Sequence, residues 1–435
     1  MNLLEVVPNE WIKASIGKYC DVQLGKMLQS DPASEQDQLK RYLRAINIAK
    51  HGLDLSHEFS MWIKPQELER FRLQRGDILV SEGGDAGRTA AFDSDAEFYF
   101  QNAINRVRPL DSAKISPEFI YYWFTFLKVA GYVEMVCNVA TIAHFTAEKV
   151  KAAPLALPPL KTQRRIAQFL DKETARIDGL IEKKRALLDR LAEKRQALIT
   201  RAVTKGLNPD APMKPSGIDW LGDIPAHWEV LPIKRCIAQI EQGWSPAAEA
   251  RTAAPEEWGV LKSGCVNDGV FDESSHKALP AGIEPKPELE VRAGDVLMCR
   301  ASGSLRFIGS VALVAEVRPN LIFSDKTYRI FLDSQKVDKY YFVYSMAAKH
   351  MREQVVLSVS GAEGLANNIA QSSVGSYLHS FPPLSEQKAI ADYLEDITNH
   401  LDCLNATIQK SVRQLNEYRS ALVTKAVTGQ IGGLQ

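Results

Sequence analysis

The chain has 435 residues, of which 45% are hydrophobic, and its 53 Lys and Arg balance its 53 Asp and Glu to a formal net charge of zero. This length predicts two to four domains, with enough apolar residues for packed cores and no apolar run long enough for a membrane span. The N-terminal residues MNLLEVVPNEW do not resemble a signal peptide, and six scattered cysteines without a C-x-x-C pair predict reduced thiols, so we expect a cytoplasmic protein.

Residues 1–157 are predicted to form an α/β globule. A Gly-containing turn precedes the β-branched run Ile78–Val80, which is typical of a strand, and the aromatic stretch PEFIYYWFTFL from Pro117 is helix-like. The Gly-rich segment SEGGDAGR from Ser81 opens no evident helix and lacks the rest of a nucleotide-binding unit. We therefore interpret this segment as a turn.

Residues 158–205 predict one long helix. It opens with PPLKTQ, where a Pro pair suits a helix entrance, and Thr162 is the expected N-cap. Apolar residues then recur every seven positions, which favours a coiled coil of roughly 60 Å at about 1.5 Å per residue. Gly206 follows where the helix should stop. The positions in this register are Leu170, Ile177, Lys184, Leu191 and Leu198.

This first helix is strongly basic although the whole chain is neutral. Residues 158–205 carry 13 Lys and Arg against six Asp and Glu, a net charge of +7, whereas residues 385–435 carry five against six. Its basic side chains could face DNA, a partner protein or only water, since a charged helix face is often merely solvated. The residues concerned are Arg164, Arg165, Lys183, Lys184 and Arg185.

Residues 206–224 predict a linker that is not free in solution. The segment is rich in Pro and Gly, yet it contains Trp220 and Leu221. Exposing two large apolar side chains to water is unfavourable, so we expect this linker to pack on the edge of a neighbouring globule.

Residues 225–381 repeat the first globule. Pro8 and Trp11 correspond to Pro225 and Trp228, and RGDILVSEGGDAGR from Arg75 corresponds to AGDVLMCRASGSLRFIG from Ala293. FQNAINRVRP likewise corresponds to FSDKTYRIFL, and strands are expected at Val296–Met298 and Val311–Val314. The copies share a framework but differ at many polar positions, which favours the binding of two different targets.

Residues 382–429 repeat the helix, and residues 430–435 form a short tail. Pro158–Thr204 aligned with Pro382–Thr428 without a gap gives 19 identities in 47 positions, and Ser385 and Gly429 take the places of cap and stop. The second seam register is Leu394, Leu401, Ile408, Leu415 and Leu422. Neighbouring positions expected to fill the two seams are Ile166, Leu180, Leu187, Leu188, Ile390, Leu404, Val412 and Val423.

The two apolar stripes need a partner, and each helix can supply one for the other. Because the chain runs globule, helix, globule, helix, an antiparallel pair inside one molecule would relate the two halves by an approximate two-fold axis. The alternatives are that the helices pair with a different protein or that they make the molecule dimerise.

The motif search finds no catalytic signature. The sequence contains no G-x-x-x-x-G-K-[ST] phosphate loop, no G-x-S-x-G elbow, no H-E-x-x-H and no Cys/His cluster at metal spacing. Pro-Pro-Leu at 158 and 382 is not the Asn/Asp-Pro-Pro-aromatic motif of amino-methyltransferases. We expect no catalytic residue, no metal and no cofactor bound by this chain itself.

The doubled motifs resemble the specificity subunits of type I restriction–modification systems. The resemblance is carried by PPLKTQ and PPLSEQ, by the helix ends ALITRAVT and ALVTKAVT, and by SGIDWLGDIPAHWEV at the start of the second half. It covers essentially the full length. One departure is Lys161-Thr162-Gln163, where the second copy keeps the more usual Ser385-Glu386-Gln387.

The resemblance implies two target-recognition domains, each reading one half of a split site in double-stranded DNA, on antiparallel spacer helices. The helices would also dock two modification subunits, which carry S-adenosylmethionine and methylate adenine. Restriction subunits would supply translocation and cleavage driven by ATP and Mg²⁺. By this resemblance the chain is not an enzyme by itself and only chooses the site.

Candidate DNA-contacting residues are polar side chains in the matching segments of the two globules, because base edges and phosphates are read mainly by Arg, Lys, Asn, Gln, Ser and Thr. Arg106 and Arg329 are equivalent, which favours a shared framework or phosphate role for them. In the first globule the candidates are Arg44, Asn47, Lys50, His51, Arg88, Gln101, Asn102, Asn105 and Arg106. In the second they are Lys262, Ser263, Asn267, Arg300, Ser302, Ser304, Arg306, Lys326, Tyr328, Arg329, Asn367 and Asn368.

Two rival functions remain open at this point. A structural adaptor would bind proteins through the same globules and would have no salt-dependent affinity for DNA. A self-contained enzyme with an unrecognised motif would transfer methyl groups without partners.

Overall fold

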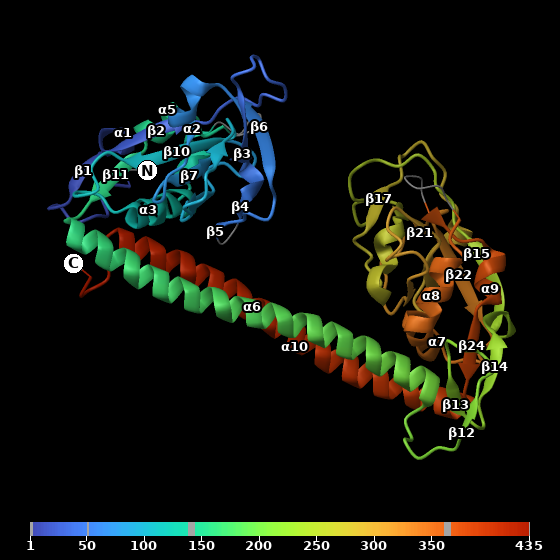
Figure 1. Cartoon of the computed structure of the whole chain (residues 1–435). Coiled ribbons are helices and arrows are strands. Elements are labelled where there is room, and N and C mark those ends of the chain that lie inside the picture. The colour runs from blue at the N-terminus through green and yellow to red at the C-terminus, as the bar shows by residue number, and fades with distance from the viewer. Residues whose placement is uncertain (1–2, 50–51, 138–143, 361–366, 435) are drawn as a thin grey trace. The chain divides into compact units, whose positions relative to one another are not determined.

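The structure is a computed structural model that describes residues 3–49, 52–137, 144–360 and 367–434. It divides into two compact units (Figure 1). Unit 1 comprises residues 1–185 and 409–435, and unit 2 comprises residues 186–408. Each unit therefore combines one globule with parts of two long helices.

Unit 1 contains a four-stranded antiparallel sheet in the order β2-β10-β7-β8 and a three-stranded sheet in the order β6-β3-β9. In the smaller sheet β3 pairs antiparallel with β6 and parallel with β9. Two ladders of two strands, β1-β11 and β4-β5, complete the unit. The strands are β1 (Ile12–Ser15), β2 (Cys20–Leu24), β3 (Gln38–Leu43), β4 (Ile48–Ala49), β5 (Gly52–Leu53), β6 (Phe59–Ile63), β7 (Ile78–Ser81), β8 (Thr89–Ala91), β9 (Tyr99–Phe100), β10 (Ile104–Pro109) and β11 (Pro154–Leu157).

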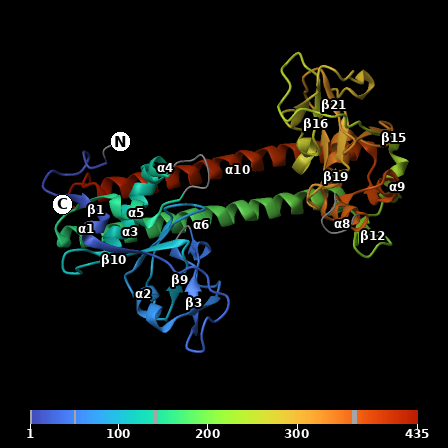
Figure 2. The same ribbon diagram turned by 90° about the horizontal axis from the view of Figure 1, so that it is seen from above.

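The four-stranded sheet of unit 1 separates two apolar cores. Ile78 and Val80 of β7 belong to the core on the helical side, whereas Leu79 between them belongs to the core shared with the three-stranded sheet. This alternation follows from the two-residue period of a strand, which points successive side chains to opposite faces. Figure 2 shows α3, β10 and then β9 and β3 following one another in that order.

Short helices cover the helical side of unit 1, except α2, whose Phe71 belongs to the core shared with the three-stranded sheet. The most apolar of them is α3, whose N-cap Ser116 accepts a hydrogen bond from the backbone N–H of Phe119. It buries Phe119, Trp123 and Phe126 among other side chains. The helices are α1 (Ile16–Tyr19), α2 (Leu68–Phe71), α3 (Pro117–Val129), α4 (Tyr132–Val136) and α5 (Ala147–Ala152), with 3₁₀ turns at Ala45–Asn47 and Pro65–Glu67.

Unit 2 repeats the two larger sheets of unit 1. Its four-stranded sheet has the order β15-β22-β18-β20, and its three-stranded sheet has the order β17-β16-β21, again with one parallel pair between β16 and β21. The strands are β12 (Met213–Pro215), β13 (Asp223–Pro225), β14 (Glu229–Pro232), β15 (Ile237–Gln242), β16 (Gly259–Leu261), β17 (His276–Ala278), β18 (Val296–Cys299), β19 (Ala301–Ser302), β20 (Val311–Leu313), β21 (Leu321–Phe323), β22 (Thr327–Leu332), β23 (Asn367–Asn368) and β24 (Leu378–Phe381).

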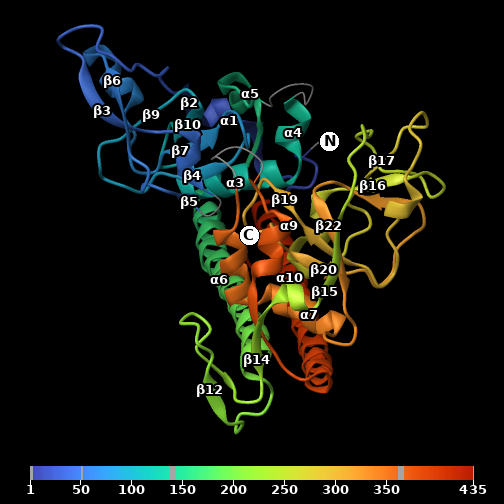
Figure 3. The ribbon, with the colours of Figure 1, turned by 90° about the vertical axis from the view of Figure 1, so that its right-hand side faces the viewer.

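The layers of unit 2 also match those of unit 1. Val296 and Met298 of β18 belong to the core on the helical side, whereas Leu297 and Cys299 belong to the core under the three-stranded sheet. Figure 3 shows β16 and β17 on one side of β20 and β22 and α7 on the other. The remaining elements are α7 (Lys339–Ala347), α8 (Lys349–Leu357), α9 (Gln371–Ser376) and 3₁₀ turns at Ile233–Arg235, Ser263–Gly269 and Pro287–Leu289.

The segment between the first helix and the second globule packs on unit 2, as expected. Leu221 is buried in the helical-side core, and Trp220 stacks on the ring of His350 with 5.8 Å between ring centroids. The ladder β12-β13 gives this segment regular structure.

The long helices are α6 (Leu160–Lys205) and α10 (Leu384–Val427). In unit 1, Ile166 and Leu170 near the start of α6 share a core with Val423 and Val427 near the end of α10. In unit 2, Ile199 and Val203 near the end of α6 share a core with Leu394 near the start of α10. Contacts of start with end in both units mean that the two helices run antiparallel.

The predicted seam lies at this helix contact with graded burial. Leu170, Ile177, Leu394 and Leu401 are buried, and Leu191, Leu198, Ile408, Leu415 and Leu422 are half-buried. The expectation that Leu180, Leu187 and Leu404 fill the seam is wrong, since these side chains are 41–50% exposed. A two-helix seam covers only two positions in each heptad, and neighbouring positions fall outside it.

The helix ends agree with the predicted stops but not with the predicted caps. Gly206 and Gly429 follow the two helices with φ of +71° and +73°, a left-handed conformation that favours glycine. The helices begin earlier than expected, at Leu160 and Leu384. Thr162 and Ser385 therefore lie inside the first turn and are not the N-caps.

Candidate nucleic-acid interface

The segments that contain most of the predicted DNA-contacting residues of unit 1 meet at Glu82, directly after β7. The backbone N–H of Glu82 donates to the carbonyl of Ala103 at 2.9 Å, and its carbonyl accepts from the N–H of Phe145 at 2.7 Å. The turn before β10 and the segment before α5 are thereby fixed to the end of β7. We call Glu82, Ala103 and Phe145 the unit 1 junction.

Unit 2 has the same junction at Arg300, directly after β18. Its N–H donates to the carbonyl of Lys326 at 2.8 Å, and its carbonyl accepts from the N–H of Ile369 at 3.1 Å. Arg300, Lys326 and Ile369 form the unit 2 junction. Ile369 therefore takes the place of Phe145 in unit 2. From the sequence alone, Asn367 and Asn368 would be aligned with His144 and Phe145, and the hydrogen bonds correct that alignment.

One buried side chain braces each junction. The amide of Asn105 donates to the carbonyl of Phe145 at 2.8 Å, and the hydroxyl of Tyr328 donates to the carbonyl of Ile369 at 3.0 Å. Both side chains come from the second residue of the central strand, and both are at most 2% exposed. The same junction is therefore held by an amide side chain in unit 1 and by a phenol hydroxyl in unit 2.

Two glycines allow a close backbone approach beside the junctions. A Cβ atom on Gly25 would lie 2.2 Å from the carbonyl oxygen of Gln101, and one on Gly243 would lie 2.2 Å from that of Phe323. Atoms do not approach so closely, so only glycine fits at these positions. Each glycine directly follows the outer strand of the sheet, β2 or β15.

The Gly-rich segment is a turn, as predicted. The N–H of Gly87 donates to the carbonyl of Ser81 at 2.9 Å, and the N–H of Gly309 donates to that of Cys299 at 2.7 Å. Both glycines have positive φ and lie against a valine, Val133 or Val355. The loops that these glycines close begin with the junction residues Glu82 and Arg300.

The unit 1 candidates divide into surface and interior residues. Arg44 is exposed, with its guanidinium carbon 4.9 Å from the ring centre of Phe59. Arg88, Gln101 and Asn102 are half-buried. These four remain available for contact with a ligand, whereas Lys50 and His51 lie outside the described residues.

Asn47 and Asn105 do not face solvent, contrary to the prediction. Asn47 is fully buried; its amide group donates to the carbonyls of Asp54 and His57, and its oxygen accepts from the N–H of Arg44. Asn105 is fully buried by its position in β10. Their amides saturate backbone groups, so we assign both to the framework.

Arg106 and Arg329 are also framework residues, which agrees with the role favoured from their equivalence. Arg106 is 5% exposed and binds Asp21 at 2.5 Å, while burial lowers the pKa of its guanidinium. Arg329 is 7% exposed and binds Glu241 at 2.5 Å and Asp295 at 3.3 Å. Tyr328, predicted as a contact, is buried as well and serves the junction.

Three of the unit 2 candidates lie at a surface pocket of about 350 Å³. Lys262, Ser263 and Lys326 line it together with Lys277 and Asp325. Three lysines on one small concave surface favour an anionic ligand such as a phosphate. Lys277 was not predicted; it lies on β17, and no motif marks it in the sequence.

Further candidates of unit 2 lie along the ladder of β19 and β23. Ser302 pairs with Asn367, and Ala301 pairs with Asn368. Ser302, Asn367 and Asn368 are half-buried, as is Asn267, whereas Ser304 and Arg306 are exposed. Arg306 makes an ion pair with Asp268 at 2.9 Å.

Arg300 is held at the junction by its own side chain. Its Nε donates to the hydroxyl of Tyr328 at 2.9 Å, and its Nη1 donates to the carbonyl of Asp325 at 3.2 Å. At the equivalent place unit 1 carries Glu82, an acidic residue that the prediction omitted because it sought basic and amide side chains. Alignment of SEGG with CRAS shows the Glu/Arg exchange.

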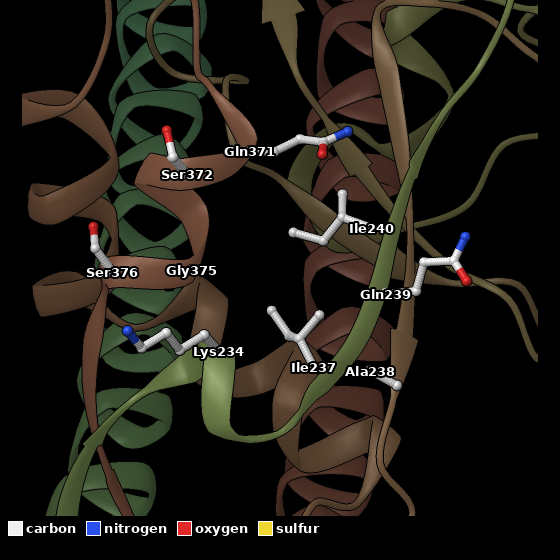
Figure 4. Close-up of a pocket in the computed structure, with 9 residues that line it drawn as sticks. All are labelled: Lys234, Ile237, Ala238, Gln239, Ile240, Gln371, Ser372, Gly375 and Ser376. Atoms are coloured by element: carbon white, nitrogen blue, oxygen red, sulfur yellow. The ribbon is translucent and has the colours of Figure 1, made fainter.

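The larger pocket in unit 2 offers no comparable chemistry. It has about 410 Å³ and lies between β15 and α9, with Ile237 and Ile240 pointing into it in Figure 4. Lys234 is the one charged side chain among its lining residues. Within the described ranges, no group of three His, Cys, Asp or Glu is placed to hold a metal ion.

The basic residues of α6 lie mostly in solvent. Arg164, Arg165, Lys183 and Arg185 are exposed and Lys184 is half-buried; Arg165 also donates to the carbonyl of Gly433 at 3.0 Å. The exposure leaves DNA and protein partners equally possible for them. None of the helices in the described part of the chain is long and apolar enough to cross a membrane.

Comparison with known proteins finds relatives that are similar to parts of this chain. Residues 8–190 match the model of the type I restriction modification DNA specificity domain. The matched segment, less than half of the chain, is similar to the DNA specificity domain of type I restriction–modification specificity subunits. The chain is 30% identical to the EcoEI specificity subunit of Escherichia coli over 206 residues, which cover 47% of this chain and 34% of that protein.

Other specificity subunits extend the similarity. The EcoKI specificity subunit of Escherichia coli strain K12 is 24% identical over 286 residues, covering 64% of this chain and 57% of that protein. The matches thus span between a third and somewhat more than half of these two specificity subunits.

The fold matches a solved structure over nearly the full chain. That structure was determined in work on complex assembly and conformational transition of the type I R-M system. Its TM-score is 0.70 at 15% identity, covering 98% of this chain and 99% of the other. The predicted fold, two α/β copies with two long antiparallel helices, is confirmed.

Proposed function

We propose that the chain is the DNA sequence-specificity subunit of a type I restriction–modification complex and is not catalytic by itself. The observation that carries this proposal is one framework with two sets of polar side chains. Both junctions have the same backbone hydrogen bonds, yet one presents Glu82 and the other Arg300 with three nearby lysines. Two units with the same framework and different polar surfaces are what recognition of a DNA site with two different halves requires.

In this proposal residues 1–157 and 225–381 are the target-recognition domains, and residues 158–205 and 382–429 are the spacer helices. Residues 206–224 link the halves and residues 430–435 form the tail. DNA contacts are assigned to the candidates on the surface and not to those in the interior. They are Arg44, Arg88, Gln101, Asn102, Lys262, Ser263, Asn267, Arg300, Ser302, Ser304, Arg306, Lys326, Asn367 and Asn368.

The chemistry would belong to partners in the cytoplasm. Two modification subunits with S-adenosylmethionine would methylate adenine, and restriction subunits with ATP and Mg²⁺ would translocate and cleave DNA. The helix pair would dock the modification subunits and set the distance between the half-sites. The name of each relative reported above, specificity subunit, supports this division of labour.

The alternative, a protein-binding adaptor, is separated by the salt dependence of DNA binding. The complex of the full chain with its modification subunits is titrated with duplex DNA at several salt concentrations. We expect the logarithm of affinity to fall linearly with the logarithm of salt, and each of K262A and K326A to reduce the slope by about one. K234A, from the pocket in Figure 4, is the matched control. An affinity for DNA that is absent or independent of salt would support the adaptor.

A further inference from the structure

At the junction residue the two units combine the same backbone hydrogen bonds with opposite charge. Glu82 directly follows β7, and Arg300 directly follows the equivalent strand β18. Each donates its N–H to the turn before the central strand, at Ala103 or Lys326. Each accepts at its carbonyl from Phe145 or Ile369. Because the backbone hydrogen bonds are the same at the two positions, Glu82 and Arg300 differ only in their side chains.

The two side chains have complementary hydrogen-bonding capacity. An ionised carboxylate only accepts hydrogen bonds, and a guanidinium only donates them in a fixed planar fork. In the major groove, Glu accepts from the amino group of cytosine, whereas Arg donates two hydrogen bonds to O6 and N7 of guanine. A Glu/Arg exchange at one framework position thus changes which base is accepted.

The contacts of Arg300 leave part of its fork available. Tyr328 and Asp325 hold Nε and Nη1, so the guanidinium plane is fixed in advance. Within the described residues, no acceptor binds Nη2 of Arg300. Nη2 and the second hydrogen of Nη1 remain for the two acceptors of a guanine.

The carboxylate of Glu82 likewise has oxygens that are available to accept hydrogen bonds from a ligand. Glu82 is half-buried, and in the described part of the chain its carboxylate makes no hydrogen bond. Burial raises the pKa of its carboxyl group; nearby His144 opposes this effect and Glu148 adds to it. A partly desolvated carboxylate without a donor is unfavourable, and a donor supplied by a ligand would relieve that cost.

We infer that Glu82 and Arg300 are equivalent specificity-determining residues, Glu82 selecting a cytosine in one half-site and Arg300 a guanine in the other. This inference rests on the proposed function, since it requires that the units read DNA. For each unit it names one residue that determines specificity and the base that this residue selects.

The test compares methylation motifs of single variants. The full chain is co-expressed with the modification subunit of its own system in cells that lack other adenine methylation, and N6-methyladenine is mapped. E82Q keeps the size of the side chain and adds a donor, which suits adenine. R300K keeps the charge and loses the planar fork. E10Q and R292K, both at exposed positions, are the matched controls.

We expect E82Q to admit adenine in place of one cytosine in one half-site only, with the preference for cytosine falling roughly tenfold. R300K should relax one G·C position in the other half-site only, by a similar factor. Both controls should keep the wild-type motif. If both variants methylate the wild-type motif unchanged, or if both alter the same half, the inference is overturned.

Failure of the proposed function has a different signature, because the wild-type chain itself would then direct no split motif. Loss of folding is detected separately by thermal unfolding of the purified complexes. If E82Q unfolds, E82D decides the matter, since it keeps the carboxylate but shortens its reach. An altered preference at the same half-site supports the inference, and an unaltered motif contradicts it.

Discussion

Arg419 of α10 binds Asp178 of α6 through two guanidinium nitrogens, with Nε and Nη2 at 2.9 and 3.1 Å from the carboxylate oxygens. The same pair occurs in unit 2 with the helices exchanged, where Arg195 of α6 binds Asp402 of α10. The repeat alignment makes Arg195 equivalent to Arg419 and Asp178 equivalent to Asp402. Each long helix thus contributes one acid and one base to matching ion pairs.

The first prediction concerns these ion pairs. Arg419 and Asp178 are only 18% and 22% exposed, whereas Arg195 and Asp402 are 32% and 57% exposed. A double-mutant cycle on R419Q and D178N should give a coupling energy of about 1–2 kcal/mol in urea unfolding. The cycle on R195Q and D402N should give less than about 1 kcal/mol, because solvent screens that pair. Equal coupling in both cycles would show that exposure does not set the strength.

The second prediction concerns two buried glutamines that join each long helix to its own globule. Gln163 binds the N–H of Ser116 and the carbonyls of Lys114 and Pro158, and Gln387 binds Asp338, Lys336 and Pro382 in the same way. Q163L leaves one buried N–H and two carbonyls without partners, so we expect a loss of about 2–4 kcal/mol in free energy of unfolding.

The matched control for Q163L is Q168L, at an exposed position on the same helix. It should change the free energy of unfolding by less than about 0.5 kcal/mol. A small effect of both substitutions would mean that the glutamine does not anchor the helix.

The third prediction concerns Gly25, where a Cβ would lie 2.2 Å from a backbone oxygen. G25A must displace the turn at Gln101, so we expect a large loss of stability and of the unit 1 half-site in the methylation motif. G179A lies in α6 with no neighbouring atom within 4 Å of the added Cβ. It should stabilise the helix by up to about 1 kcal/mol, since Ala favours helix over Gly. Similar thermal unfolding of G25A and the wild type would contradict the close approach.

The fourth prediction concerns pH and two buried histidines of unit 2. His350 and His379 share a hydrogen bond of 2.9 Å, and His379 also contacts the hydroxyl of Tyr341 at 3.0 Å. Burial lowers the pKa of His350 to about 4 and holds the pKa of His379 well below its usual value of 6.5. The unfolded chain therefore takes up protons before the folded chain does, and unit 2 should lose stability as the pH falls from about 6.5 toward 4.

H379L introduces the residue that unit 1 has at the equivalent position, Leu155. It should flatten the fall of the melting temperature between pH 7 and pH 5, because one buried titrating group is removed. H400L, at an exposed histidine of α10, should leave the pH profile as in the wild type. An unchanged profile in H379L would mean that other groups control the acid sensitivity.

The fifth prediction concerns the spacer helices as a ruler. Four residues inserted at matching levels of α6 and α10 add roughly 6 Å, about one helical turn, and roughly preserve the apolar face. The spacer of the methylated motif should lengthen by one or two base pairs, at about 3.4 Å each. A two-residue insertion is the control, since it turns the apolar stripe away and should abolish methylation. An unchanged spacer in an active four-residue variant would contradict the ruler.

The sequence predicted the repeat, the helix pair and the strand positions because these follow from periodicity and turn residues. Ile78 and Val80 alternate with Leu79 between two cores, and Leu170 and Leu394 lie in the seam, as local patterns require. Leu180 and Leu404 were misplaced because a heptad pattern does not show how wide a two-helix seam is. The helix starts were misplaced because Thr162 and Ser385 look like caps from residue type alone.

The site was predicted less well, for a physical reason. Asn47, Asn105 and Arg106 have the side chains that read DNA, but the same groups also satisfy buried backbone and carboxylate partners. Sequence does not show which of these uses applies, because burial depends on contacts between distant segments. Glu82 was missed because its importance lies in its equivalence to Arg300, which becomes evident only when the backbone hydrogen bonds of the two junctions are compared.

The central claim is that two similar units select two different halves of one DNA site. Its most direct test is the map of N6-methyladenine in cells that express the wild-type chain with its modification subunit. The account predicts one split motif, with two different short halves at a fixed spacing. Methylation of a single continuous motif, or none when the two proteins are present and associated, would contradict it.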